Sequence, residues 1–235
     1  MRTLLIDADD TLWENNIFYE DCFSEFGALM AHQGFDKGEA EHTADAVERE
    51  RIPVVGYAVE EFARSLVMAY EQLCERYRKD VDDGVAASVM EIGMMPADYP
   101  IVLLEGVEET LEQLSQRFRL ILVTKGDPDL QTDKLRRSGL GRYFAGVHVV
   151  AEKDVDVYRT IVAQYELVHD QTWMVGNSPR SDINPAVEAG IGAVYVPHSN
   201  TWTLEVVDVA EPEKVVVLHR FSDLIELFAG AENAR

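Results

Sequence analysis

Short apolar runs recur along the chain, and each is followed by charged, amide or small polar residues. The runs lie at 2–7, 120–124, 146–150, 172–176, 192–197 and 214–218. Continuous apolar runs of this length are typical of strands that are buried on both faces of a parallel sheet. Helical spacing or helix-end signals mark the stretches 107–118, 127–139, 157–167, 185–190 and 221–230 between and after them. This alternation predicts an α/β fold, a doubly wound parallel sheet with a Rossmann-like core.

The segment between the first two predicted strands has a different period. Apolar side chains recur every three or four positions from Phe18 to Leu29, and again over 59–77, as they do in amphipathic helices. The stretch "MMPADYP", which contains two prolines, ends this helical block. We therefore expect residues 1–14 and 100–235 to form the α/β core and residues 15–99 to form a helical insert.

Charge and cysteine content narrow the classes of partner and compartment. The formal net charge is −22, from 43 acidic and 21 basic residues, and a chain this acidic repels nucleic acid and anionic membranes. The sequence has two cysteines, no visible signal peptide and no run of about eighteen apolar residues. These features lead us to expect a cytoplasmic protein with reduced thiols and no membrane span.

Polar side chains with catalytic potential follow four of the predicted strands. The first strand is followed by Asp7, Asp9 and Asp10, the second by Thr124, Lys125 and Gly126, the third by Lys153, and the fourth by Asn177 and Asp182. Ligands of doubly wound sheets bind outside the carboxyl ends of the strands, so we expect these residues to converge there. Carboxylates that are close together repel one another, and hard oxygen ligands of this kind suit Mg²⁺.

These residues also form an ordered series of motifs. They are "DADDT" at 7–11, the threonine that ends "LILVT", the lysine of "VVAEKDV", and "VGNSPRSDI" at 175–183. The series resembles the four motifs of the haloacid dehalogenase superfamily of phosphohydrolases. The resemblance covers roughly 1–13 and 100–228, and the helical insert between the first two motifs is similar in position to that family's cap domain.

The resemblance implies a role for each residue. Asp7 is implied to be the nucleophile that forms an aspartyl-phosphate, and Asp9 the general acid and then the general base. Their two-residue spacing puts both side chains on one side if the chain stays extended. The implied phosphate-binding residues are Thr124, Lys125, Gly126 and Lys153. The implied Mg²⁺ ligands are Asp7, the carbonyl oxygen of Asp9, Asn177 and Asp182. The expected activity is Mg²⁺-dependent hydrolysis of a small phosphorylated metabolite.

Two positions depart from the family pattern. Asn177 stands where an aspartate is usual, and its amide oxygen can bind a metal without contributing charge, so Asp182 is expected to carry more of the metal binding. Lys153 is followed by Asp154 instead of proline, and we expect this acid or Glu152 to bind the lysine ammonium. Asp10 is expected to cap the following turn, and Ser181 is expected to cap a helix.

Alternative functions remain open from the sequence. A phosphomutase uses the same two aspartates, whereas a 2-haloacid dehalogenase releases halide and has no use for a proton donor such as Asp9. A phospho-receiver signalling domain also gathers acids, Thr and Lys at a sheet edge, but it is about half this length and has no cap. A non-catalytic phosphate-binding protein is the last alternative, suggested by Asn177. The substrate and the oligomeric state are not specified by the sequence.

Overall fold

The computed structural model describes residues 2–230. The chain divides into two compact units, one formed by the described parts of Met1–Asn16 and Ile101–Arg235, the other by Ile17–Pro100. Within the described range, none of the helices combines the length and apolar character needed to cross a membrane.

The first unit is built on one six-stranded sheet. Its strands are β1 (Thr3–Ile6), β2 (Arg119–Lys125), β3 (Gly146–Val150), β4 (Thr172–Gly176), β5 (Gly192–Tyr195) and β6 (Val215–Val217). Their order is β3-β2-β1-β4-β5-β6 and every neighbouring pair is parallel. The predicted doubly wound α/β core is therefore confirmed.

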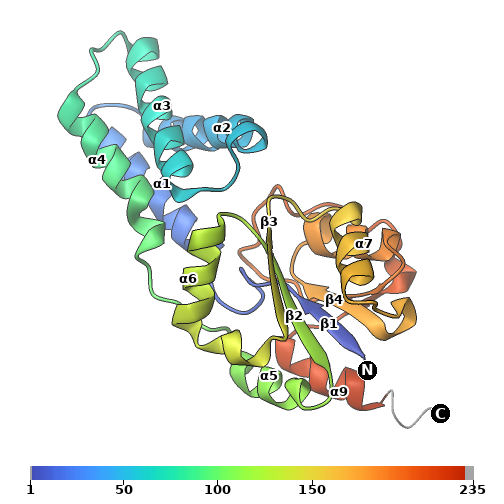
Figure 1. Ribbon diagram of the computed structural model, residues 1–235. Coiled ribbons are helices and arrows are strands. Elements are labelled where there is room, and N and C mark those ends of the chain that lie inside the picture. The colour runs from blue at the N-terminus through green and yellow to red at the C-terminus, as the bar shows by residue number, and fades with distance from the viewer. Residues whose placement is uncertain (1, 231–235) are drawn as a thin grey trace. The chain divides into compact units, whose positions relative to one another are not determined.

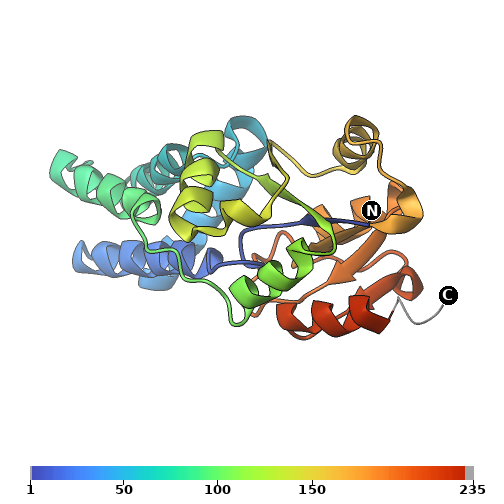
Figure 2. The same ribbon diagram turned by 60° about the horizontal axis from the view of Figure 1, so that its bottom comes forward.

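Helices cover both faces of this sheet (Figures 1 and 2). One face packs against α5 (Val107–Ser115), α6 (Pro128–Ser138) and α9 (Leu224–Gly230), and the other packs against α7 (Val155–Gln164) and α8 (Asn184–Glu188). Successive strand side chains point to opposite faces, so Leu4 and Ile6 join the first core and Leu5 joins the second. All three are fully buried, which explains why the strand lacks polar alternation.

The strand order places β1 and β4 at the point where the chain changes direction across the sheet. The chain runs outward from β1 through β2 to β3, and then returns to β4 on the other side of β1. Ile6 is in register with both Leu122 and Val175, and the amide of Asp7 donates to the Val175 carbonyl at 3.0 Å. Ligands of doubly wound sheets bind at this switch point, so the residues after β1 and β4 form the candidate site.

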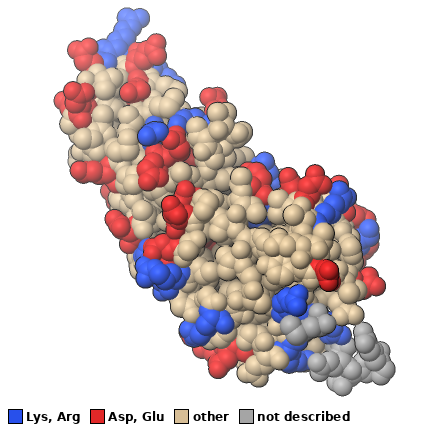
Figure 3. All heavy atoms as spheres, in the orientation of Figure 1, with Lys and Arg blue, Asp and Glu red and all other residues tan. Residues whose placement is uncertain are grey.

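The second unit is formed by four α-helices and the short 3-10 helix Met95–Ala97. The α-helices are α1 (Asn16–His32), α2 (Lys37–Val55), α3 (Val59–Tyr77) and α4 (Asp83–Met94). Phe26 of α1 and Leu66 of α3 are among the buried residues of its core. Gly93 allows α4 to approach α3 closely, because a Cβ there would lie 2.3 Å from the Ala63 Cα. Acidic side chains are spread over both units in the view of Figure 3, so negative charge is not confined to the strand ends.

Candidate active site

Three buried charged side chains meet at the end of β1. The ammonium of Lys153 donates to Asp7 Oδ1 and to Asp182 Oδ1, each at 2.5 Å. The three residues are between 0 and 5 % exposed. Burial alone would lower the pKa of Lys153, but the two carboxylates raise it well above its usual value, so the side chain is an ammonium. The structure thus brings together three residues predicted from three different strand ends.

The fourth-motif residue Asn177 lies beside this group. The hydroxyl of Thr11 is 2.9 Å from Asp7 Oδ2 and 3.3 Å from Asn177 Oδ1. The Asn177 amide nitrogen donates to Thr201 Oγ1 at 2.9 Å, which fixes the oxygen of Asn177 toward Thr11. Carboxylate and amide oxygens from β1 and β4 are therefore adjacent, as the sequence predicts.

Asp182 reaches Lys153 through an unusual turn. Residues Pro179–Ile183 form one π-helical turn before α8, and this turn contains Asp182. Gly176 lies so close to this carboxylate that a Cβ there would be 2.2 Å from Asp182 Oδ2. The turn is capped by Ser178, whose hydroxyl accepts from the Ser181 amide at 2.9 Å. The prediction that Ser181 is the cap is wrong, because Ser178 has that role.

The chain turns sharply after Asp7. Asp10 adopts φ = +58°, and its amide donates to the Trp13 carbonyl at 2.8 Å. The Asp10 carboxylate accepts from the amides of Asn15 and Asn16 at 2.8 and 3.1 Å, so its predicted capping role is confirmed. Burial and the neighbouring Asp9 carboxylate raise the pKa of Asp10 to about 7.

Asp9 is bound by side chains other than those that bind Asp7. Asp9 Oδ1 accepts from Trp13 Nε1 at 2.7 Å, and Asp9 Oδ2 accepts from Gln131 Nε2 at 2.7 Å. Lys134 Nζ lies 3.0 and 3.1 Å from the two oxygens. Burial opposes ionisation, but Lys134 and these donors together lower the pKa of Asp9. The chain turns directly after this pair, because the Ala8 carbonyl accepts from the amides of Thr11 and Leu12 at 3.2 and 2.8 Å.

The other predicted phosphate-binding residues lie at the end of β2. Thr124 is buried and in register with Val149 of β3. Gly126 has φ = +133°, a value that residues with a side chain rarely adopt, and its amide donates to the Val150 carbonyl at 3.1 Å.

Asp154 caps α7 by accepting from the Val157 amide at 2.9 Å. It does not bind the ammonium of Lys153, which bonds Asp7 and Asp182 instead, so that expectation is wrong for Asp154.

Lys125 is held by Glu205, a residue that the sequence analysis missed. Its ammonium pairs with Glu205 Oε1 and lies 3.2 Å from Ser181 Oγ. Glu205 Oε2 accepts from the hydroxyls of Ser178 and Ser181, both at 2.5 Å. This buried carboxylate therefore joins the second-motif and fourth-motif loops. Burial opposes its ionisation, but Lys125 and the two hydroxyls lower the pKa of Glu205 to about 2.

We expect Glu205→Gln to remove a pH-dependent part of the stability. A carboxyl with a depressed native pKa stabilises the fold above its unfolded pKa, near 4.5, and loses that contribution as the pH falls toward 2. A shift of this size corresponds to roughly 3 kcal/mol at neutral pH. Urea unfolding at pH 7, 5 and 3 should show the gap between wild type and variant narrowing as the pH falls.

The control for this prediction is Glu211→Gln, because Glu211 pairs with Lys214 on an exposed surface. An exposed pair contributes little, so that variant should stay within about 0.5 kcal/mol of wild type at each pH. A gap for Glu205→Gln that does not change between pH 7 and pH 3 would contradict the assignment of Glu205 as an ionised buried group.

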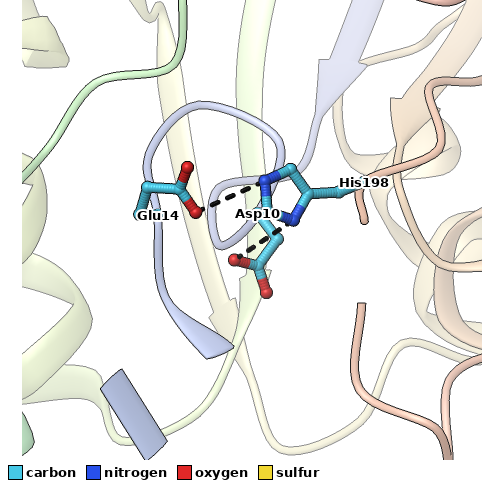
Figure 4. Close-up of side chains that lie close together, drawn as sticks. All are labelled: Asp10, Glu14 and His198. Atoms are coloured by element: carbon cyan, nitrogen blue, oxygen red, sulfur yellow. Dashed lines mark ion pairs between the residues drawn. The ribbon is translucent and has the colours of Figure 1, made fainter. Parts of the chain in front are cut away.

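A second cluster contains Asp10, Glu14 and His198 (Figure 4). His198 Nε2 lies 3.3 Å from Glu14 Oε2, and His198 Nδ1 lies 3.8 Å from Asp10 Oδ1. Each residue offers one possible ligand atom, and these three atoms lie within 4.8 Å of one another, which is close enough to hold a metal ion. The Asn200 amide donates to His198 Nδ1 at 3.3 Å, whereas Glu14 Oε2 is a buried oxygen without a hydrogen-bond partner among the described residues. This cluster ties Glu14 to the loop after β5.

The residues around Asp7 fit the implied Mg²⁺. Asp7, Asn177 and Asp182 offer oxygen donors alone, the ligands that this ion prefers. When both carboxylates are ionised, Lys153 neutralises one of the two charges. Burial and the nearby Asp7 raise the pKa of Asp182 to about 7, against the opposing effect of Lys153. A divalent cation would offset this repulsion.

Comparisons with known proteins agree with this geometry. A family model for haloacid dehalogenase-like hydrolases matches residues 1–190. A phosphoserine phosphatase of Thermus thermophilus is 27 % identical over 228 residues, covering 83 % of this chain and 88 % of its own length.

Solved structures are also similar. A haloacid dehalogenase-like family hydrolase from Xanthomonas campestris has a TM-score of 0.82 and 25 % identity, with 100 % of this chain and 95 % of that chain covered. A putative β-phosphoglucomutase from Thermotoga maritima has a TM-score of 0.67 and 19 % identity, with 98 % and 99 % covered, and supports the fold alone.

Proposed function

Because the chain belongs to the haloacid dehalogenase-like hydrolases, we propose that it is a phosphatase that hydrolyses a small phosphorylated metabolite through an aspartyl-phosphate on Asp7. Asp7 lies at the switch point of the sheet, where its carboxylate is buried and oriented by Lys153 and Thr11. In this proposal an Asp7 oxygen attacks phosphorus, and Lys153 offsets the negative charge of both groups. Thr124, Lys125 and Gly126 lie on the strand and loop that we propose bind the phosphoryl oxygens.

The presence of Asp9 favours hydrolysis of a phosphate ester over release of a halide. Cleavage of a phosphate ester releases an alkoxide, which needs a proton, whereas halide leaves without one. Asp9 is a second carboxyl group at this site, held by three side chains of the first unit, and because its pKa is lowered it must take up a proton as the phosphate ester binds before it can act as the donor. Asp9 would give its proton to the leaving oxygen and then take one from the water that attacks the intermediate.

We propose that Mg²⁺ is held by Asp7, the Asp9 carbonyl, Asn177 and Asp182. The ion would neutralise phosphoryl charge and orient the reacting oxygens when bound. We also propose that the helical unit Ile17–Pro100 acts as a cap that sets substrate specificity. The cytoplasm remains the proposed compartment, and nucleic acid remains an unfavourable partner for a chain of this charge.

The direct test is release of phosphate from p-nitrophenyl phosphate and from a panel of phosphorylated metabolites, with and without Mg²⁺. Phosphoserine belongs in the panel because the similar Thermus thermophilus protein is a phosphoserine phosphatase. Mg²⁺-dependent phosphate release, absent in Asp9→Ala for alkyl substrates, is the expected result. Halide release from a 2-haloacid, or transfer of the phosphoryl group to a second hydroxyl, would replace the proposal with a dehalogenase or a mutase.

We expect Mg²⁺ to stabilise the protein, because it binds the native site and not the unfolded chain. At a hundred times its dissociation constant the gain is about 2.7 kcal/mol. Asp182→Asn should strongly reduce the rise in melting temperature that Mg²⁺ causes. Asn177→Asp adds an anion near the ion, so the same rise should occur at lower Mg²⁺ concentrations. Thermal melting across a Mg²⁺ titration measures all three proteins.

The control for the titration is Asp156→Asn, which removes one acid whose side chain is 87 % exposed on α7. Its Mg²⁺ response should match that of wild type. If Asp182→Asn also titrates like wild type, the ligand assignment is wrong, and if wild type does not respond, the metal is not part of this site.

A further inference from the structure

Lys134 of α6 makes contacts that the four motifs do not explain. Its ammonium lies 3.0 and 3.1 Å from the two Asp9 oxygens and 2.7 Å from Asn15 Oδ1. The residue is 7 % exposed. Burying an ammonium is costly unless it is paired, so its placement against Asp9 is a specific feature of this site.

The acid step generates charge where Lys134 lies. As Asp7 attacks, an Asp7 oxygen–phosphorus bond forms and the bond from phosphorus to the leaving oxygen breaks. The bonding electron pair stays on the leaving oxygen, which takes the proton of Asp9. Asp9, which takes up this proton when the ester binds, is left as a carboxylate, and the carboxylate is the form that Lys134 contacts in the structure.

We propose that Lys134 is a positioning residue for Asp9, and that its ammonium fixes the Asp9 carboxyl group in the place from which it protonates the leaving oxygen. A reacting group that is already held in its productive geometry lowers the barrier, because the cost of orienting it has been met before the reaction. The inference rests on the proposed phosphatase function and adds a residue to it.

Neighbouring groups fix Lys134 and Asp9 in this arrangement. Asn15 accepts from the ammonium through its side-chain oxygen, and Gln131 donates to both Asp9 Oδ2 and the Lys125 carbonyl. Gln131 and Lys134 are three positions apart on α6, so both can face the same carboxylate. One helix therefore supplies two donors that orient the Asp9 carboxyl group.

The test compares substrates whose leaving groups differ in their need for a proton. p-Nitrophenolate leaves without help, whereas an alkoxide does not, so kcat/KM should depend on Asp9 only for the alkyl substrate. The enzymes are wild type, Asp9→Asn, Lys134→Met, Lys134→Arg and Asn15→Ala, assayed with p-nitrophenyl phosphate and the best alkyl phosphate of the panel. Arg136→Met is the matched control, because it removes an exposed cation of the same helix that pairs with Asp133.

We expect Lys134→Met to lower kcat/KM for the alkyl phosphate by roughly 100-fold or more and for the aryl phosphate by less than about 5-fold. Lys134→Arg, which keeps the charge, should recover most of the loss, and Asn15→Ala should show the same selectivity with a smaller effect. Arg136→Met should behave like wild type with both substrates.

An equal loss with both substrates in Lys134→Met would show a structural role and overturn the inference while leaving the phosphatase intact. If Lys134→Met does not fold, Lys134→Arg and Asn15→Ala decide by the same ratio: equal effects on both substrates overturn the inference. Wild type that hydrolyses neither ester would instead remove the proposed function on which the inference rests.

Discussion

Replacing Asp7 with asparagine is expected to abolish turnover while leaving the fold intact. The asparagine amide is a poor nucleophile, so the aspartyl-phosphate cannot form. Loss of a catalytic nucleophile lowers the rate by several orders of magnitude. The amide oxygen introduced by Asp7→Asn can still accept a hydrogen bond from Thr11 or Lys153, and the Lys153 ammonium still has Asp182 as a partner. Phosphate release under saturating Mg²⁺ measures the effect.

Stability distinguishes a catalytic from a structural role for Asp7. Asp7→Asn removes one of two buried carboxylates around a single ammonium, and it removes the repulsion that helps to raise the pKa of Asp182. Without Mg²⁺ the variant should therefore melt no lower than wild type. Near-normal activity, or a large drop in metal-free stability, would show that Asp7 is not the nucleophile described above.

Lys153→Met is expected to destabilise the protein by about 3–5 kcal/mol without metal, because it leaves two buried carboxylates without a counter-charge. Both lie between 0 and 4 % exposed, so water cannot replace the ammonium. The cost should be larger at pH 8 than at pH 5, since burial and Asp7 already raise the pKa of Asp182, and its ionisation without Lys153 costs more stability as the pH rises. Urea unfolding at the two pH values gives the difference.

A double variant isolates the cause of that loss. Adding Asp7→Asn to Lys153→Met leaves one buried carboxylate, so part of the lost stability should return. Arg159→Met, which removes a cation with a 56 % exposed side chain from α7, should cost less than about 0.5 kcal/mol. Additive losses for Asp7 and Lys153 would mean that the two side chains do not share a charge interaction.

Much of the fold and the centre of the site could be predicted from the sequence for one physical reason. Buried parallel strands have continuous apolar sequences, and their carboxyl ends lie along the same edge of the sheet. Residues that follow these strands are therefore close in space even when they are far apart in the chain. Asp7, Lys153 and Asp182 follow this rule, and the structure places them within hydrogen-bonding distance. The roles assigned to them remain proposals.

The residues that support the site could not be predicted in this way. Glu205 pairs with Lys125 across 80 positions, and Lys134 reaches Asp9 across 125 positions. Glu205 lies outside regular structure, and Lys134 sits mid-helix, where a lysine usually faces solvent. Local pattern gives no signal for a charge that a distant loop buries, so these contacts appear only once the chain is folded.

Local backbone geometry limited the prediction for Asp9. The spacing of "DADD" places two carboxylates on one side of an extended chain, but the left-handed residue Asp10 closes a turn in which Asp9 forms a bridge with Trp13. Aspartate tolerates this conformation better than most residues, and its side chain then caps the turn. The spacing alone therefore predicted neither this turn nor the contacts of Asp9 with Trp13, Gln131 and Lys134.

If Asp7 carries the phosphoryl group, the aspartyl-phosphate can be trapped on the protein. Wild-type protein is mixed with radiolabelled acetyl phosphate and Mg²⁺, quenched in acid, and treated with hydroxylamine, which cleaves acyl phosphates. We expect acid-stable, hydroxylamine-labile label on the peptide that contains Asp7, and none in Asp7→Asn. Phosphate release without labelled protein, or label on another residue, would contradict it.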